Sequence, residues 1–128
     1  MIVLLFRSEK KTKSENLSEN EKIIQDAAKY ISENFSDDIT LKKLAEKYAM
    51  SESHFSRTFK KYTGLGVSKY VKLARLRYAE KLLKESKLSV TQVALTCGFN
   101  NSNYFISEFK RFKGITPFKY GNFNKDGN

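Results

Sequence analysis

The sequence predicts an all-α fold of seven helices, arranged as two similar halves that one long helix joins. Three observations carry this prediction. Apolar residues recur at helical spacing from about Glu21 to Tyr120, helix-start signals and glycine stops divide that stretch, and the chain matches itself after a shift of about 50 residues. No alternating apolar and polar segment of useful length indicates a strand. The length of 128 residues suffices for one domain with its own core.

The first half of the chain contains three predicted helices. The first runs from about 21 to 35, because one apolar stripe repeats along it: Ile24, Ala27, Ala28, Ile31 and Phe35. Thr40 is the expected N-cap of a short second helix, and Ser51 caps a third after a turn at Ala49-Met50. Gly64 ends the third helix. The buried residues expected on these two helices are Leu41, Leu44, Ala45, Tyr48, Phe55, Phe59 and Tyr62.

A long helix is predicted next, from about Ser68 to Ser86, and it joins the two halves. Its broad apolar side is formed by Tyr70, Val71, Leu73, Ala74, Leu76, Ala79, Leu82 and Leu83. With about 19 residues it would be about 28 Å long at 1.5 Å per residue.

The second half contains three further helices. Ser89-Val90-Thr91-Gln92 is a capping box that opens a short helix ending at Gly98. A longer helix follows the turn at 99–102 and ends at Gly114. Thr116-Pro117, an N-cap followed by proline at the first helical position, opens a last short helix. The buried residues expected here are Val90, Val93, Ala94, Cys97, Phe105, Phe109 and Phe112.

The two halves repeat one motif. A shift of 49 positions aligns Leu44-Ala45 with Val93-Ala94, and a shift of 50 aligns Phe59-Lys60-Lys61 with Phe109-Lys110-Arg111, so the second copy has one extra residue in its turn. Each copy, at about 41–63 and about 89–113, is a short helix, a tight turn and a longer helix. That is the plan of a helix-turn-helix, whose second helix can enter a major groove of DNA. The alternative is a duplicated helical bundle that binds nothing.

The charge of the chain favours a polyanionic partner. Twenty-four Lys and Arg oppose fourteen Asp and Glu, so the formal net charge is +10 and the pI is near 9.7. Nucleic acid, an anionic membrane and an acidic protein all fit this charge. A membrane-binding module would spread its cations along a helix with a wide exposed apolar face, whereas here the cations follow each second helix. Double-stranded DNA is therefore the expected partner, and no membrane is expected.

The ends of the chain are expected to lie outside the domain. Residues 1–20 are interpreted as a tail and linker, in which the apolar Met1–Phe6 ends an upstream regulatory domain. An arm that packs back on the domain, or a disordered tail, is the alternative for Met1–Phe6. The DNA-binding domain is expected at 21–121, and a flexible tail at 122–128. One cysteine, no membrane span and no signal-peptide features predict a cytoplasmic, nucleoid-associated protein.

The most specific stretches lie in the second copy. They are Val93-Ala94, Cys97-Gly98-Phe99, Tyr104-Phe105, Phe109-Lys110-Arg111, Gly114-Ile115-Thr116-Pro117 and Tyr120. Together they resemble the signature of the AraC/XylS family of bacterial transcription regulators, over about Glu21 to Tyr120. The segment 51–61 of the first copy, SESHFSRTFKK, is similar to the first recognition helix of that family.

The resemblance implies two homeodomain-like subdomains with seven helices, and usually activation of transcription near promoters, where RNA polymerase is a partner. It also implies a position behind a sensing or dimerising domain. Because the sequence shows no obvious interface, the fragment is expected to be monomeric, and the full-length protein to dimerise through an upstream domain. The chain departs from the family at Ser107 and Gly121, where arginine is common. The first departure weakens the expectation that the second copy reads bases, and the second removes a cation.

On the first recognition helix, the expected DNA-facing residues lie opposite the aromatic ones. Arg57 is the main candidate for a base contact, because its planar fork can donate to O6 and N7 of guanine together. A phosphate contact or an intramolecular ion pair is the alternative for Arg57. Ser53 and Ser56 are further candidates for base contacts. Phosphate contacts are expected from Ser51, Lys60 and Lys61, and their loss would weaken binding to all sequences alike.

On the second recognition helix, the candidates for base contacts are Ser102, Asn103, Ile106 and Ser107. Asn103 can pair with N6 and N7 of adenine, and Ile106 can touch a thymine methyl group. Because this stretch holds no arginine, we expect it to read DNA less stringently. Phosphate contacts are expected from Asn101, Lys110, Arg111, Lys113 and Thr116. Arg75 and Arg77 on the joining helix either bind phosphates or pair with carboxylates.

The length of the joining helix adds a geometric expectation. Recognition helices held at its two ends would lie about one DNA turn apart, roughly 34 Å, on one face of the duplex. A rigid connector does not match a straight duplex at both ends. We therefore expect the DNA to bend or one copy to engage loosely.

Catalysis is not expected. The sequence has one histidine, one cysteine, no glycine-rich phosphate loop and no metal-ligand spacing, so no metal or cofactor is predicted. His54 is interpreted as a packing or hydrogen-bonding residue beside Phe55. Cys97 lies on the buried face of its helix, where a free cysteine behaves as a small hydrophobic residue.

Overall fold

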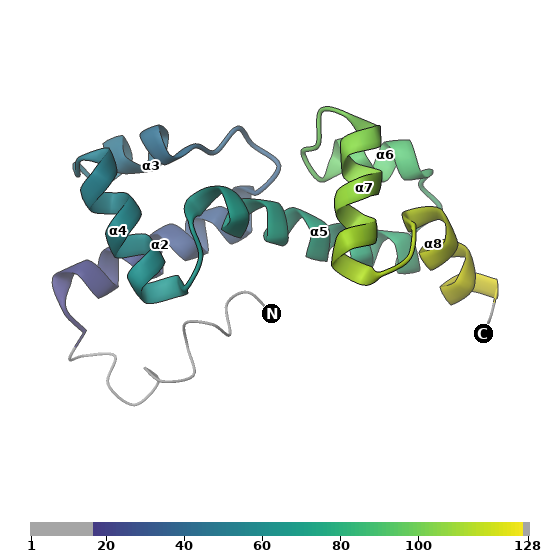
Figure 1. The fold of residues 1–128 in the computed structure, drawn as a ribbon, viewed down its shortest axis with the longest axis horizontal. Coiled ribbons are helices and arrows are strands. Elements are labelled where there is room, and N and C mark those ends of the chain that lie inside the picture. Colours follow the sequence, from purple (N-terminus) through teal and green to yellow (C-terminus); the bar gives the residue numbers. More distant parts are fainter. Residues whose placement is uncertain (1–16, 127–128) are drawn as a thin grey trace. The chain divides into compact units, whose positions relative to one another are not determined.

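The computed structural model describes residues 17–126, and the side chains of residues 17–122. Within that range all regular structure is helical, which confirms the all-α prediction. The helices are α2 (Glu19–Asn34), α3 (Leu41–Lys47), α4 (Glu52–Thr63), α5 (Val67–Glu85), α6 (Val90–Thr96), α7 (Ser102–Lys113) and α8 (Pro117–Asp126) (Figure 1). The chain divides into two compact units, unit 1 up to Ala74 and unit 2 from Arg75. The Met1–Phe6 hypothesis falls outside the described residues.

Side-chain caps begin the helices where the sequence predicts them. Thr40 accepts a hydrogen bond from the Lys43 N–H at 3.1 Å, and Ser51 accepts one from the His54 N–H at 3.1 Å. The predicted capping box of Ser89 has both of its bonds, 2.9 and 3.1 Å long. Helix α2 begins two residues earlier than predicted, because Ser18 and Glu21 form a second capping box.

Helix α8 continues past the predicted end of the domain at Gly121 and reaches Asp126. Gly121 therefore lies within the helix rather than at its stop. A Cβ atom at Gly121 would be 3.3 Å from the carbonyl oxygen of Leu83, so glycine permits α8 to approach α5 closely. A larger residue would require one of the two helices to shift.

Unit 1 packs α2, α3, α4 and the beginning of α5 around one apolar cluster. Its members with 0–1% exposure are Ile24, Ala27, Ile31, Leu44, Ala45, Phe55, Phe59 and Tyr70. The ring of Phe59 lies 5.8 Å from that of Phe55 and meets Tyr70 edge-on at 5.2 Å. Four residues predicted to be buried are instead half-buried at the rim of the cluster: Phe35, Leu41, Tyr48 and Tyr62.

Unit 2 has a cluster of its own, between the second half of α5, α6 and α7. It consists of Leu76, Ala79, Leu83, Val93, Ala94, Cys97, Phe99, Phe105 and Phe109. Cys97 is fully buried as predicted, and burial raises the pKa of its thiol to about 12. Val90 and Phe112 are half-buried against this cluster. The broad apolar side of α5 thus serves two cores in succession, which explains why its stripe is wider than one contact needs.

The two helix-turn-helix turns differ in length but share a left-handed residue. The first turn occupies 48–51 and the second 97–101, which confirms the extra residue of the second copy. Ala49 has φ 56°, and Gly98, its partner in the repeat, has φ 98°. Left-handed backbone is unfavourable by roughly 1–2 kcal/mol for a residue with a Cβ atom.

Substitutions at these two positions are therefore expected to act asymmetrically. Gly98→Ala should lower the free energy of unfolding by about 1 kcal/mol, because alanine would adopt the left-handed conformation that glycine tolerates. Ala49→Gly should leave stability unchanged or raise it slightly, since relief of strain offsets the greater entropy of unfolded glycine. Urea denaturation measures both. A loss of about 1 kcal/mol for Ala49→Gly, as in an ordinary helix, would contradict this account.

Candidate nucleic-acid interface

Helix α4 presents a polar face opposite its buried aromatic residues. Phe55 and Phe59 are fully buried, and this turns Ser53 and Arg57 outward. A guanidinium nitrogen of Arg57 lies 3.4 Å from Ser53 Oγ, one turn earlier on the same helix. Among the described residues no carboxylate pairs with Arg57, so the ion-pair alternative is not realised there. Its other N–H donors remain available to a partner outside the chain.

Two cations lie on the last turns of α4. Lys60 and Lys61 are both exposed, and Lys61 Nζ lies 5.2 Å from the centroid of the Tyr62 ring. Within residues 17–122 neither lysine has a carboxylate at ion-pair distance. Ser56 was expected to face outward, but it is half-buried where α4 faces the beginning of α5.

Helix α7 presents fewer free donors than α4. Ser107 Oγ donates to the carbonyl oxygen of Tyr104 at 3.0 Å, which occupies the only proton of that hydroxyl. Ile106, expected to face outward, packs against the core of unit 2 and is half-buried. Ser102 is half-buried as well. Asn103 is exposed, and Tyr104 beside it is 49% exposed. These two residues dominate the outward surface of the first turns of α7.

Three of the expected phosphate contacts are N-caps. Ser51 opens α4, Asn101 opens α7 with a 2.9 Å bond from the Tyr104 N–H, and Thr116 precedes α8 with a 3.3 Å bond from the Lys119 N–H. In each case the side-chain oxygen accepts a bond from its own helix. The hydroxyl protons and the Asn101 amide protons remain able to donate to an anion.

The cations of α7 are unequally available. Lys110 is exposed, and no carboxylate among the described residues pairs with it. Arg111 lies 3.8 Å from a carboxylate oxygen of Glu108. Lys113 is held 3.0 Å from Glu80 Oε2, and its side chain is only 30% exposed. Lys110 is therefore the stronger phosphate candidate of the three, and Lys113 the weakest.

Glu80 joins three helices of unit 2. Its Oε2 accepts bonds from Lys113 of α7 at 3.0 Å and from the Tyr120 hydroxyl of α8 at 2.9 Å, while Glu80 itself lies on α5. Partial burial acts to raise the pKa of the Glu80 carboxyl, but these two hydrogen bonds and the positive charges of Lys113 and Lys84 together outweigh it and hold the pKa below its usual value. Burial, together with the same bond, raises the pKa of Tyr120 to about 12.

Sequence reasoning missed both carboxylates that restrain the cations of α7. Glu108 is only 7% exposed, and its spacing from Phe105 and Phe112, three residues before and four residues after it, already placed it on the buried side of the helix. That spacing could have revealed the burial of Glu108 from the sequence. No sequence signal could have revealed the role of Glu80, because its partners are far away in sequence. For Arg77, phosphate binding stays a prediction, and its guanidinium lies 5.9 Å from the centroid of the Phe112 ring.

The interpretation of His54 requires correction. His54 is exposed on the first turn of α4, and its backbone N–H rather than its ring takes part in the Ser51 cap. It is therefore no core-packing residue. The helical period does not decide this, because Thr58, one turn further along the same side of α4, is buried. Exposure on the first turn depends instead on which residues of other helices lie beside it.

The described residues show neither a metal-ligand cluster nor a membrane span. Among them, no three His, Cys, Asp or Glu side chains gather as a metal ion would require. No helix in the same range has both the length and the apolar character needed to cross a membrane.

Known proteins are similar to this chain in sequence and in fold. Residues 44–122 match a family described as a helix-turn-helix domain. The chain is 34% identical over 96 residues to the bifunctional transcriptional activator/DNA repair enzyme AdaA of Bacillus subtilis, a match that covers 75% of this chain and 46% of AdaA. The chain thus spans about half the length of this curated relative.

Two solved structures share the fold over most of the chain. A transcriptional regulator with an AraC-type DNA-binding domain from Chromobacterium violaceum superposes with a TM-score of 0.76 at 26% identity, covering 84% of this chain and 96% of that one. The DNA-binding domain of AdpA, solved in complex with a target DNA, has a TM-score of 0.76 at 25% identity, covering 82% and 96%.

The structure contains two capped helix-turn-helix units, each with cations on its second helix. Together with these similarities, the two units define the class of the protein as a helix-turn-helix DNA-binding domain of a transcription regulator. The chain belongs to the AraC/XylS family.

Proposed function

We propose that the chain binds double-stranded DNA in a sequence-specific manner, with α4 and α7 in successive segments of the major groove, and thereby activates transcription. The observation that supports this most directly is the outer face of α4. There Arg57, Lys60 and Lys61 are exposed and no described carboxylate neutralises them. A face of this kind combines a planar donor for base edges with cations for the flanking phosphates.

The two units are proposed to contribute unequally to sequence recognition. In unit 1, Arg57 reads guanine, and Ser53 assists it from the preceding turn. In unit 2, Asn103 is the main reader, because the Ser107 hydroxyl is occupied and Ile106 and Ser102 are half-buried. Unit 2 therefore reads fewer bases and chiefly contacts phosphates. The contacts assigned to backbone phosphates are Ser51, Lys60, Lys61, Asn101, Lys110, Arg111, Thr116 and, with the least weight, Lys113.

The wider setting of the domain is part of the same proposal. Residues 21–121 act as a DNA-binding domain without catalytic activity. The protein is bacterial and acts in the cytoplasm, where DNA and RNA polymerase are its partners. Residues 1–20 connect it to an upstream regulatory domain through which the full-length protein dimerises. AdaA is named as both a transcriptional activator and a DNA repair enzyme, and the match covers only 46% of its length. An activity in such additional segments would not belong to the domain described here.

Selection of binding sites from random duplex DNA tests this proposal. At about 100 mM salt, where non-specific attraction is partly screened, we expect an enriched motif with a stringent block and a second, weaker block about 10 base pairs away. Arg57→Ala should weaken the preference for guanine within the stringent block, by about 1–3 kcal/mol of binding free energy.

Arg57→Lys is the matched control, because lysine keeps the charge but lacks the fork. It should retain the salt dependence of binding and lose the preference for guanine. Strong binding without any enriched motif would reject sequence-specific recognition. A single block would mean that unit 2 holds only the DNA backbone.

A further inference from the structure

A surface groove in unit 1 lies beside the outer face of α4. It has a volume of about 390 Å³ and is lined by Leu41, Ser56, Lys60, Gly66, Val67, Ser68 and Lys69. The beginning of α3, the middle of α4 and the beginning of α5 form its walls. Ser56 and Lys60 are one turn apart on α4, next to Arg57, so the groove adjoins the proposed base-reading surface.

The polar lining of this groove suits an anion. Lys60 and Lys69 contribute two ammonium groups, and Ser56 and Ser68 contribute two hydroxyl groups. The lining contains no carboxylate, and none of these four side chains has a hydrogen-bond or ion-pair partner among the described residues. Uncompensated ammonium groups beside free hydroxyl donors are the chemistry that proteins use for phosphate oxygens.

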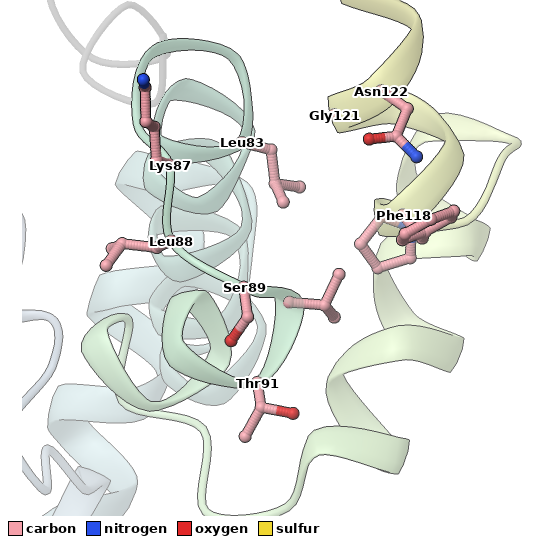
Figure 2. A pocket seen from close by; sticks show the side chains of 10 residues that line it. Leu83, Lys87, Leu88, Ser89, Thr91, Phe118, Gly121 and Asn122 are labelled. Atoms are coloured by element: carbon pink, nitrogen blue, oxygen red, sulfur yellow. The ribbon is translucent and has the colours of Figure 1, made fainter. Parts of the chain in front are cut away.

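The internal repeat provides a comparison within the same chain. In unit 2, a groove of about 440 Å³ lies near the corresponding helix start, but Phe118 occupies the position of Ser68 and is 66% exposed. Figure 2 shows Phe118 on the α8 side of that groove, with Ser89 and Thr91 on the other side. Lys110 and Lys119, which correspond to Lys60 and Lys69, do not line it. The lining of the unit 2 groove includes one lysine, Lys87, from the loop before α6, whereas the pair of lysines from the recognition helix and from the helix after it belongs to the unit 1 groove alone.

We infer that the unit 1 groove binds one backbone phosphate of DNA, held by Lys60, Lys69 and the hydroxyls of Ser56 and Ser68. The inference rests on the proposed DNA binding and deepens it. It assigns Ser56 to the phosphate rather than to a base, and it adds Ser68 and Lys69 to the interface. A phosphate bound here would fix the register of α4 in the major groove, and Arg57 would then meet a defined base pair.

A double-mutant cycle between protein and DNA tests the inference. Wild-type chain and Lys69→Ala are titrated with the selected duplex and with duplexes that each carry one uncharged methylphosphonate along the strand. We expect one position at which the methylphosphonate weakens wild-type binding about tenfold and weakens binding of Lys69→Ala distinctly less, because Lys60 and the two hydroxyls still contact that phosphate. Lys69→Ala should also lower the slope of log affinity against log salt by about one.

Two further variants separate this site from general attraction by positive charge. Lys119→Ala removes the same charge at the corresponding position of unit 2, and we expect it to keep the wild-type methylphosphonate profile. Ser68→Phe introduces the unit 2 residue into the unit 1 groove without a change of charge, and we expect it to lose the sensitive position. Helicity by circular dichroism checks that each variant is folded.

The outcomes distinguish the inference from the function on which it rests. If the wild type binds its selected duplex specifically but Lys69→Ala responds to every methylphosphonate as the wild type does, the phosphate site is overturned and the proposed function stands. The phosphate site is likewise overturned if Lys119→Ala and Lys69→Ala change the profile at the same position. If the wild type prefers no duplex, both proposals fail together.

Discussion

Phe109→Ala is expected to lower the free energy of unfolding by about 3–5 kcal/mol, among the largest effects of any single substitution in this chain. Phe109 is fully buried at the centre of the unit 2 aromatic cluster. Its ring lies 5.7 Å from Phe105, 6.2 Å from Phe112 and 5.5 Å from Tyr120. Removal of the ring therefore leaves a cavity and ends three aromatic contacts at once. Thermal and urea unfolding measure the loss.

Phe118→Ala is the matched control for this prediction. It removes the same side chain from the same unit, but Phe118 is 66% exposed. We expect a change of at most about 0.5 kcal/mol, as for other surface substitutions. Equal losses for Phe109→Ala and Phe118→Ala would contradict the assignment of the unit 2 core.

Tyr120→Phe and Tyr70→Phe are expected to change stability in opposite directions, although the repeat aligns the two tyrosines. Tyr120→Phe should lower the free energy of unfolding by about 1–2 kcal/mol, because it removes a hydrogen bond to the charged, partly buried Glu80. The Tyr70 hydroxyl is buried, and no described group bonds to it. Tyr70→Phe should therefore be neutral or should stabilise by up to about 1 kcal/mol, since burial of an unpaired hydroxyl is unfavourable.

Acid titration provides a second measurement of the Glu80 bonds. Since they hold the pKa of folded Glu80 below its usual value of about 4.3, their stabilisation is fully present at higher pH. It is lost as the pH falls through the lowered folded pKa. Wild type and Tyr120→Phe should therefore differ most at neutral pH and converge in acid. A constant difference from pH 7 to pH 3, or equal effects of Tyr70→Phe and Tyr120→Phe, would show that Glu80 does not stabilise the fold through Tyr120.

Local sequence signals placed the helices because the interactions that begin and end them are local. Thr40, Ser51 and Ser89 each bond to a backbone N–H three residues away, and Gly64 and Gly114 end helices in left-handed conformations. The misplaced boundaries have similar causes. Ser18 caps α2 ahead of its predicted start, and α8 continues past the predicted domain end at Gly121, where glycine permits a close approach between helices.

The candidate interface was harder to predict, because exposure on a helix depends on what packs beside it. Arg57 faces outward as the helical period indicates. The helical period also predicts that Ile106 and Ser56 face outward, but both are half-buried, since neighbouring residues of their own units cover them. His54 shows the reverse case, in which a residue expected to pack is exposed.

The sequence by itself determined the all-α class, the two helix-turn-helix copies, the longer second turn and the burial of Cys97, since each follows from periodicity, caps or internal repetition. Only the tertiary structure decided which polar side chains remain free for DNA. The bonds from Lys113 and Tyr120 to Glu80 join residues 33 and 40 positions apart. Sequence periodicity cannot reveal such pairs, because it orders the residues within one helix and leaves unspecified which side chains of other helices they meet.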